Sequence, residues 1–338
     1  MASFATPGPS LGDEVPGLAR ASFVKERWKR HVAALGTLAT LAALLSTPSR
    51  AQDTPSDAAS QTDKAANTPV PAPVQTPARE APPDLTRMNA QAQAAWLTQA
   101  AHDGRLEKLD DAQLVALFKT VSADGLATYV KQGVSDLGEY EFEVTRQERL
   151  NSHWQERPEY LDVRYHQSPM QIYAKWLPGG PHKGQEVIYD ETRRPNQMFG
   201  HLGGIFRAVS IWISLDGPFA RSQSNHSLRD IGLQYAAFSF AGEVAKFEAA
   251  GVGAPTQVDV EEQHGVRLVV FTWETPTGRP AFYAKRERLG IDLRHPWFRS
   301  IESFDNDGEP FEKFFYDKVV PRQFGDSAFD PKNPDYQF

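Results

Sequence analysis

Residues 170–189, MQIYAKWLPGGPHKGQEVIY, decide how the rest of the chain can fold, because they predict two strands joined by a tight turn. Side chains alternate along an extended chain, so Ile172, Ala174 and Trp176 share one face and Tyr173 lies on the other. Residues 178–184, PGGPHKG, end both strands, since proline has no amide for the ladder and glycine adopts the positive φ that a reversal needs. The stretch is typical of an antiparallel meander.

The same alternation recurs along the chain, and residues 305–308, DNDG, add a strong turn signal near the end. Further strands are predicted over 137–144, 161–165, 197–202, 209–215, 258–260, 266–273, 282–288, 297–304 and 311–319. Helical spacing of apolar residues predicts helices over about 86–102, 110–121, 126–130 and 227–250. About eleven strands without strand–helix–strand alternation indicate a mainly β (α+β) protein. We expect a strongly curved antiparallel sheet, an unclosed barrel, with helices covering its concave side.

The first 84 residues are not predicted to belong to the folded domain. A basic segment from Lys25 precedes an apolar run of about fourteen residues that ends in a small-residue site at Ala51, so residues 1–51 are predicted to be a signal peptide. A membrane anchor needs a longer run. Residues 52–84 are rich in Pro and Ala and predict a disordered linker, which leaves 85–338 as a single domain with N-terminal helices.

Charge and cysteine content exclude several classes of protein. The chain has a net charge of −7, and its first 50 residues are net basic, so the remainder is more acidic and does not suit binding to nucleic acid. No cysteine is present, which rules out disulfides, thiolate metal sites and thiol nucleophiles. We expect no cofactor.

The sequence shows few signs of catalysis. It contains no H-E-x-x-H, G-x-S-x-G or phosphate-binding loop, and no histidine has a ligand partner at helical or strand spacing. His226 stands just before the last predicted helix, where Asn225 or Ser227 would cap the helix, and Glu148 and Arg149 end a strand. His226, Glu148 and Arg149 are the polar candidates, with packing and a surface ion pair as their ordinary alternatives.

Aromatic residues are abundant, with 20 Phe, 10 Tyr and 7 Trp. A curved sheet that presents them inward can leave an apolar cavity for an apolar ligand, or can be filled completely by its own side chains. If Ile172 faces inward, the predicted cavity wall consists of Phe142, Val163, Ile172, Ala174, Trp176, Val187, Ile211, Ile213 and Phe238. If Tyr173 does instead, the assignments shift by one residue.

A set of short motifs recurs in a recognisable order: Gly138–Tyr140, Gln147–Arg149, Ser168-Pro169, 172–177, 184–189, Asn225-His226, Ile231–Leu233 and the closing 329–336. In these motifs the chain resembles an uncharacterised family of secreted bacterial proteins, known only as a domain of unknown function and placed near the LolA/LolB lipoprotein carriers. His166 stands where the family often has a basic residue. The resemblance implies an unclosed barrel with helices on its concave side, an apolar cavity for acyl chains, and no catalytic residues.

These observations favour a periplasmic or secreted carrier of a lipid, an acyl chain or another apolar ligand. Its expected partners are a lipid or an acylated protein, with transient membrane association and no nucleic acid. A non-catalytic envelope scaffold that binds a protein partner is the alternative, and a hydrolase that uses His226 with Asp230 or Glu148 is a distant third.

Overall fold

The computed structural model describes residues 82–276 and 282–338. The chain divides into two compact units, Met1–Arg79 and Glu80–Phe338, and only the second unit contains described residues. The predicted signal peptide and nearly all of the predicted linker therefore lie outside the described residues. In the described part, no helix is both long and apolar enough to cross a bilayer.

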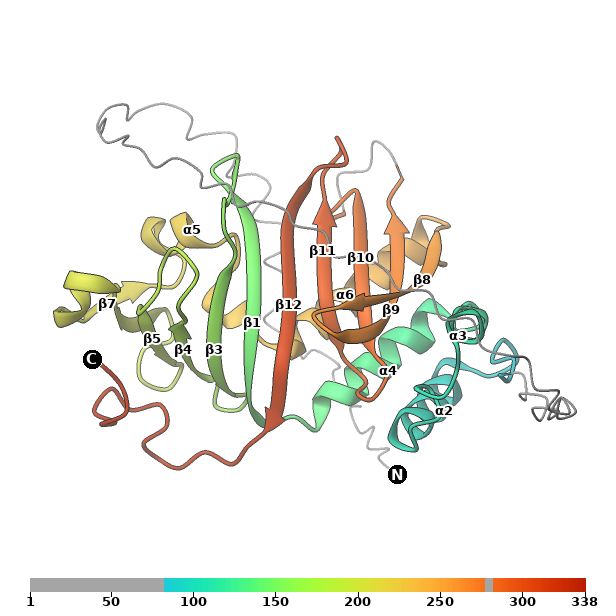
Figure 1. Ribbon diagram of the computed structural model, residues 1–338, viewed down its shortest axis with the longest axis horizontal. Helices are drawn as coiled ribbons and strands as arrows, with labels where there is room; N and C mark the ends of the chain where they lie inside the picture. The colour runs from blue at the N-terminus through green and yellow to red at the C-terminus, as the bar shows by residue number, and fades with distance from the viewer. Residues whose placement is uncertain (1–81, 277–281) are drawn as a thin grey trace, which may run out of the picture. The chain divides into compact units, whose positions relative to one another are not determined.

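The centre of the fold is one antiparallel sheet of twelve strands that does not close into a barrel (Figure 1). Its order is β7-β6-β5-β4-β3-β1-β12-β11-β10-β9-β8, with the short β2 paired only to β1, so the predicted fold class is confirmed. The strands are β1 (Glu139–Leu150), β2 (His153–Trp154), β3 (Glu159–His166), β4 (Gln171–Trp176), β5 (Glu186–Asp190), β6 (Gln197–His201), β7 (Ile211–Ser214), β8 (Gln257–Gln263), β9 (Val266–Glu274), β10 (Arg286–Asp292), β11 (Phe298–Phe304) and β12 (Pro310–Pro321).

At the centre of the sheet the first strand, β1, pairs with the last strand, β12. On either side of this pair the strands follow one another as meanders. The hairpin of β4 and β5 is confirmed, with positive φ at Gly179 and Gly184 but not at Gly180. Gly180 is restricted for another reason, since a Cβ there would lie 3.1 Å from the backbone of Glu159.

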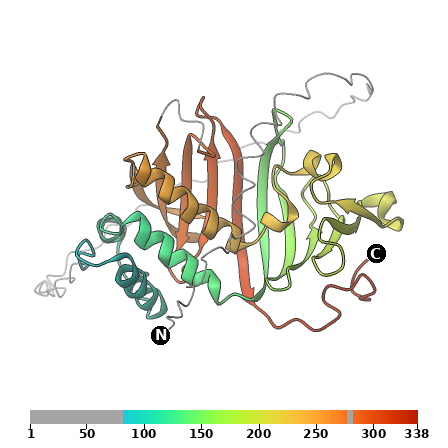
Figure 2. The ribbon, with the colours of Figure 1, turned by 180° about the vertical axis from the view of Figure 1, so that it is seen from behind.

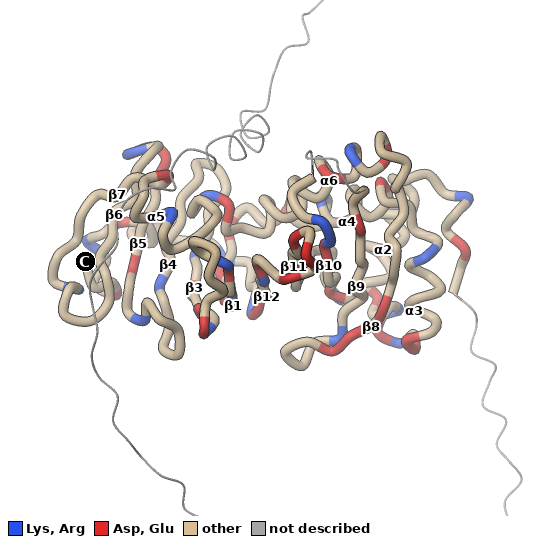
Figure 3. The backbone as a smooth tube through the Cα atoms, turned by 90° about the horizontal axis from the view of Figure 1, so that it is seen from above, with Lys and Arg blue, Asp and Glu red and all other residues tan. Residues whose placement is uncertain are grey.

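Helices cover one face of the sheet. The helices of the described part are α2 (Ala90–His102), α3 (Asp111–Phe118), α4 (Ala123–Ser135), η2 (Gly204–Ala208), α5 (Pro218–Gln223), η3 (Leu228–Asp230) and α6 (Leu233–Ala249), and not all of them contact the sheet. Helices α4 and α6 lie against the half of the sheet that contains β9 to β12, as the views from behind and along the strands show (Figures 2 and 3). The three predicted N-terminal helices are confirmed by α2, α3 and α4.

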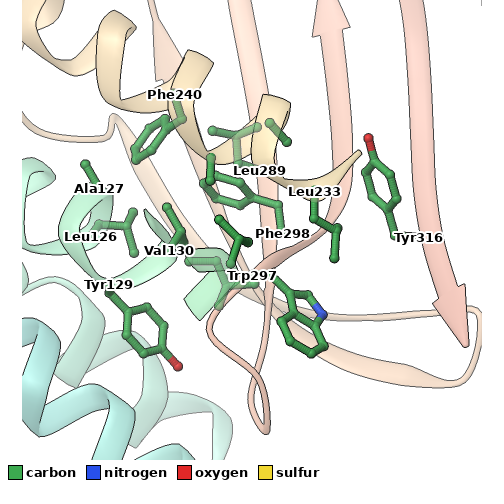
Figure 4. Packing of buried hydrophobic residues seen from close by; sticks show 14 of the residues in the cluster. Leu126, Ala127, Tyr129, Val130, Leu233, Phe240, Leu289, Trp297, Phe298 and Tyr316 are labelled. Carbon is green, nitrogen blue, oxygen red and sulfur yellow. The ribbon is translucent and has the colours of Figure 1, made fainter. Parts of the chain in front are cut away.

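The main apolar cluster fills the space between these helices and the sheet (Figure 4). Leu126 and Val130 of α4 are almost completely buried there, and Phe240 of α6 meets Phe298 of β11 edge-on, with ring centroids 5.2 Å apart. Buried aromatic and aliphatic side chains of this kind supply most of the favourable free energy of folding.

The prediction of one continuous helix over 227–250 was wrong at its start. A 3-10 turn, η3, is followed by α6, which begins only after Gly232. A Cβ at Gly232 would lie 2.8 Å from the ring of Tyr165 and 2.9 Å from the hydroxyl of Tyr140, so the chain passes too close to the sheet there for any side chain. Residues 216–232, which we call the strap, therefore cross the sheet before α6 begins.

The opposite face of β3 to β5 is covered by the C-terminal segment. Tyr173 stacks on Tyr336 with ring centroids 4.0 Å apart, and Ile188 and Phe329 complete this second cluster. Ile172 and Ala174 belong to the main cluster instead. The face question left open by the sequence is thus resolved: Ile172, Ala174 and Trp176 point toward the helices and the strap.

Candidate functional site

A row of polar side chains crosses the helix-covered face of the sheet near one end of β1 and β12. Alternation along β1 places Arg146 and Glu148 on the same face as Tyr140, whose hydroxyl accepts a hydrogen bond from the amide of Leu233 at the start of α6. Glu148 is paired directly with Glu312 of β12, and both carboxylates are almost completely buried. Two like charges at opposite positions destabilise a sheet unless other groups compensate them.

The strap supplies the compensating groups for Glu148. Asn225 donates its backbone amide to Oε1 of Glu148 at 2.8 Å, and the hydroxyl of Ser224 donates to Oε2 at 2.9 Å. The guanidinium of Arg146 lies 3.7 Å from the same carboxylate. These contacts hold residues 224–225 against the end of β1. Of the two caps predicted for the helix, Asn225 binds the sheet instead, and Ser227 is the N-cap of η3.

His226 compensates Glu312. Its Nε2 lies 2.8 Å from Oε2 of Glu312, and Ser303 of the neighbouring strand donates to Oε1 at 2.8 Å. Burial by itself would lower the pKa of His226, but the charge and hydrogen bond of Glu312, together with the nearby carboxylates, outweigh burial and raise the pKa to about 9. Burial would raise the pKa of Glu312, and the same contact with His226 lowers it instead. The pair is therefore an ion pair at neutral pH.

Aromatic rings surround His226. The ring of Tyr235 lies 5.9 Å from it, that of Phe314 5.6 Å and that of Tyr283 6.1 Å, measured between centroids. The hydroxyl of Tyr283 donates to Oε2 of Glu312 at 2.7 Å and is 3.3 Å from Nε2 of His226. Glu148, His226 and Glu312 each offer a ligand atom, and these atoms all lie within 4.8 Å of one another, so this is a group that could hold a metal ion.

A third buried carboxylate, Glu159, lies on β3, on the other side of β1 from Glu312. Glu159, opposite Arg146 on β3, contacts the Arg146 guanidinium at 3.1 Å, the indole nitrogen of Trp176 and Nδ1 of His182. Burial would raise the pKa of Glu159, but the contacts with His182 and Arg146 outweigh it and lower the pKa. Arg146 thus links the two carboxylate sites.

Two of the three polar candidates predicted from the sequence, Glu148 and His226, meet in this cluster. Arg149 does not: the strand's alternation turns it away, and it pairs with Asp305 and donates to the carbonyl of Pro310 at 2.6 Å. Sequence reasoning missed Glu312 altogether. The sequence around Glu312 does not indicate that this side chain is buried. Its position opposite Glu148 depends on the pairing of the first strand with the last.

The predicted cavity wall separates into two groups. Six of its residues are almost completely buried in the main apolar cluster: Phe142, Val163, Ile172, Ala174, Trp176 and Val187. The other three residues are more exposed. Ile213 is partly buried against the cluster, Ile211 is 55% exposed and Phe238 is 47% exposed.

The family model of proteins of unknown function DUF1571 matches residues 137–338, and the chain belongs to this family. The resemblance drawn from the sequence motifs is thereby confirmed. No curated protein matches the chain.

Three solved structures to which the chain is similar share little sequence with it. The chain is similar to an uncharacterized conserved protein from Thermus thermophilus (TM-score 0.35, 9% identity, 62% of this chain and 96% of that chain). It is similar to the LolA superfamily protein NE2245 from Nitrosomonas europaea (TM-score 0.28, 11% identity, 62% and 97%) and to the Mycobacterium tuberculosis lipoprotein LppX (TM-score 0.33, 11% identity, 59% and 97%). Identities this low leave no residue roles to carry over.

Proposed function

We propose that this protein is a non-catalytic lipid binder of the bacterial envelope, exported by its N-terminal segment, and that it contacts lipid through one edge of its sheet. The observation that carries the proposal is a concentration of exposed apolar side chains in η2 and β7. Ile205 is 89% exposed, Val209 64% and Phe206 61%. We call these three residues, together with Ile211 and Trp212, the apolar rim.

Single exposed apolar residues are normal on a protein surface, but a concentration of them at one edge points to a contact site. The rim places five large apolar side chains within eight residues, on and just before the edge strand β7, and alternation puts Ile211 and Trp212 on opposite faces of that strand. Burying such side chains stabilises a complex by roughly 1.5–3 kcal/mol each. None of this free energy is gained while the rim is in water, so we propose that an apolar partner covers the rim.

The charges around the rim favour a lipid with an anionic headgroup. Residues 192–229 contain five Arg and one Asp, in a chain whose net charge is −7, and three of these Arg form ion pairs with Asp residues. Arg194 lies over the ring of Trp212 at 4.1 Å, and Arg207 donates to the side chain of Gln337. Within the described residues neither arginine forms an ion pair. Cations beside exposed apolar groups are the pattern of surfaces that bind anionic membranes.

The rim differs from the cavity that the sequence predicts. Six of the predicted wall residues are packed under the helices and the strap, and an apolar ligand would have to displace these elements to reach them. Ile211 is the one predicted wall residue that belongs to the rim. We therefore propose that the rim makes the first contact with lipid.

A protein partner is the second candidate, because the edge strand β7 also presents backbone groups that a strand of another protein can pair with. Catalysis by His226 is not part of the proposal. The described contacts of its ring are a carboxylate, a phenol and three aromatic rings, and none of them is a serine or threonine nucleophile.

Vesicle flotation tests the proposal. Purified protein is mixed with vesicles of phosphatidylcholine alone or with vesicles in which about a third of the lipid is phosphatidylglycerol, an anionic lipid that suits a basic surface. We expect flotation with the anionic vesicles, and at least about a tenfold loss for the double variant Ile205→Ser/Phe206→Ser. Phe238→Ser is the control, since Phe238 is an exposed apolar residue of α6, which is not part of the rim.

Two results would contradict the proposal. Loss of flotation with Phe238→Ser but not with the rim variant would move the contact to the region of α6. Absence of binding to either vesicle, with a protein strand captured at β7, would favour the scaffold.

A further inference from the structure

We propose that Glu148, His226 and Glu312 form a binding site for a single divalent transition-metal ion, of which Zn²⁺ fits the donor set best. The site is separate from the apolar rim, and the inference does not rest on the proposed function. It rests on where three elements bring their side chains: β1 supplies Glu148, the strap supplies His226 and β12 supplies Glu312.

The donor set is one imidazole nitrogen and two carboxylate oxygens. Zn²⁺ is bound by histidine at about 2.0–2.1 Å and by carboxylates at about 2.0–2.2 Å, and three protein ligands with one open position are typical of zinc sites that are not purely structural. At these bond lengths, two ligands of a tetrahedral ion are about 3.3–3.6 Å apart. The three ligand atoms lie within 4.8 Å of one another, so small side-chain rotations would complete the site.

The groups behind the ligands are arranged to hold them. The hydroxyl of Ser303 donates to the outer oxygen of Glu312, Oε1, and leaves Oε2 directed toward His226. The amide of Asn225 and the hydroxyl of Ser224 hold Glu148. Partners of this kind orient metal ligands and are part of the design of most metal sites.

A fourth polar group, a tyrosine hydroxyl, lies close to the ligand atoms of Glu312 and His226. The hydroxyl of Tyr283 is 2.7 Å from Oε2 of Glu312 and 3.3 Å from Nε2 of His226. It marks the side of the triad where a fourth ligand, either this phenol or a water molecule, would complete a tetrahedron.

The local charge favours a cation. Glu148 and Glu312 are directly opposite each other on β1 and β12, and both are buried. In the metal-free protein the proton on Nε2 of His226 bridges to Glu312, and a bound ion would take the place of that proton. Alternatively, His226 is only a structural ion-pair partner of Glu312 and binds no metal. The experiment must distinguish a metal ligand from a structural partner.

The test is Zn²⁺ binding to the full-length protein after treatment with a chelator, measured by competition with a chromogenic indicator and by elemental analysis. We expect one tightly bound ion per chain, and at least a tenfold weaker affinity for Glu148→Gln, His226→Gln and Glu312→Gln. His182→Gln is the matched control, because His182 also faces a buried carboxylate, Glu159, yet has no second carboxylate opposite it. It should bind like the unaltered protein.

Co²⁺ substitution of the unaltered protein gives a readout that needs no variant. We expect absorption bands in the visible range with the intensity of a four-coordinate ion, which Zn²⁺ abolishes by displacement. The proposal is overturned if less than one ion binds per chain, if His182→Gln weakens binding as much as His226→Gln, or if bound Co²⁺ shows only the weak bands of an octahedral surface ion. Circular dichroism checks that each variant is folded.

Discussion

Glu148 and Glu312 lie directly opposite each other on the two central antiparallel strands, and both are almost completely buried. Desolvating two carboxylates at such a short separation is strongly unfavourable, so the fold depends on the groups that neutralise them. Those groups come mainly from the strap, through Ser224, Asn225 and His226. The cluster therefore fastens the strap to the centre of the sheet.

Removing the histidine should destabilise the metal-free protein considerably. In His226→Gln the carboxylate of Glu312 loses its cation while it stays buried, and we expect the free energy of unfolding to fall by about 3 kcal/mol, as for other broken buried ion pairs. Urea denaturation with a chelator present measures this. His166→Gln, in a partly exposed pair with Glu139, should change it by less than about 1 kcal/mol. Equal effects of the two substitutions would show that the cluster does not stabilise the fold.

Substitution of Phe for Tyr should have different effects on stability at two buried tyrosines. The hydroxyl of Tyr140 donates to Gln234 at 2.6 Å and accepts from the amide of Leu233 at 2.9 Å, so Tyr140→Phe leaves two buried polar groups unsatisfied and should lower stability by about 1–3 kcal/mol. The hydroxyl of Tyr129 is buried without a partner among the described residues, so Tyr129→Phe should be neutral or stabilising. Thermal unfolding of both variants checks the contrast, and a destabilised Tyr129→Phe would contradict it.

The sheet could be predicted from the sequence because strand alternation and turn residues are local properties. The hairpin of β4 and β5 and the turn at 305–308 both form as expected, with Gly308 at a positive φ. The cluster could be predicted only as separate residues. Glu148 and His226 stood out as polar candidates, but nothing local relates them to Glu312, because that contact requires the pairing of β1 with β12.

The boundary of α6 shows a second limit. Helical spacing runs on through Leu228 and Ile231, yet the close approach of Gly232 to Tyr165 and Tyr140 separates them from the helix. Tertiary packing overrides the local pattern at this point, and a single sequence contains no sign of it. The exposed position of Ile211 has a similar origin, since whether an edge strand is covered depends on the rest of the fold.

The C-terminal segment should contribute to stability through Tyr336. Its ring is buried against Tyr173, and its hydroxyl accepts a hydrogen bond from Arg164 at 2.9 Å. We expect Tyr336→Ala to lower the free energy of unfolding by about 3 kcal/mol, and Tyr336→Phe, which keeps the ring, by about 1 kcal/mol. Urea denaturation distinguishes them. If Tyr336→Ala had no effect, the segment would not be packed on the sheet in solution.

A pH dependence follows from Glu287, which lies on the same row as Glu312. Burial, together with the charges of Glu243 and Glu312, raises the pKa of Glu287 to about 8 in the folded protein, against an opposing effect of Lys246. The pKa in the unfolded chain is near the ordinary value of about 4.3.

The sign follows from proton binding. Below about pH 4 the carboxyl is protonated in both states, so it does not affect the pH dependence of stability. Between that pH and about 8 the unfolded chain releases a proton that the folded protein retains, and the free energy of unfolding falls as the pH rises. Glu287→Gln cannot release that proton. We therefore expect the variant to match the unaltered protein near pH 4 and to be more stable by about 1 kcal/mol or more near pH 8. Urea denaturation at the two pH values measures the difference, and Glu309→Gln, at an exposed turn position, controls for the loss of a negative charge. A difference that stayed constant with pH would mean that Glu287 is ionised in the folded protein at neutral pH, and that its neighbours do not suppress its charge.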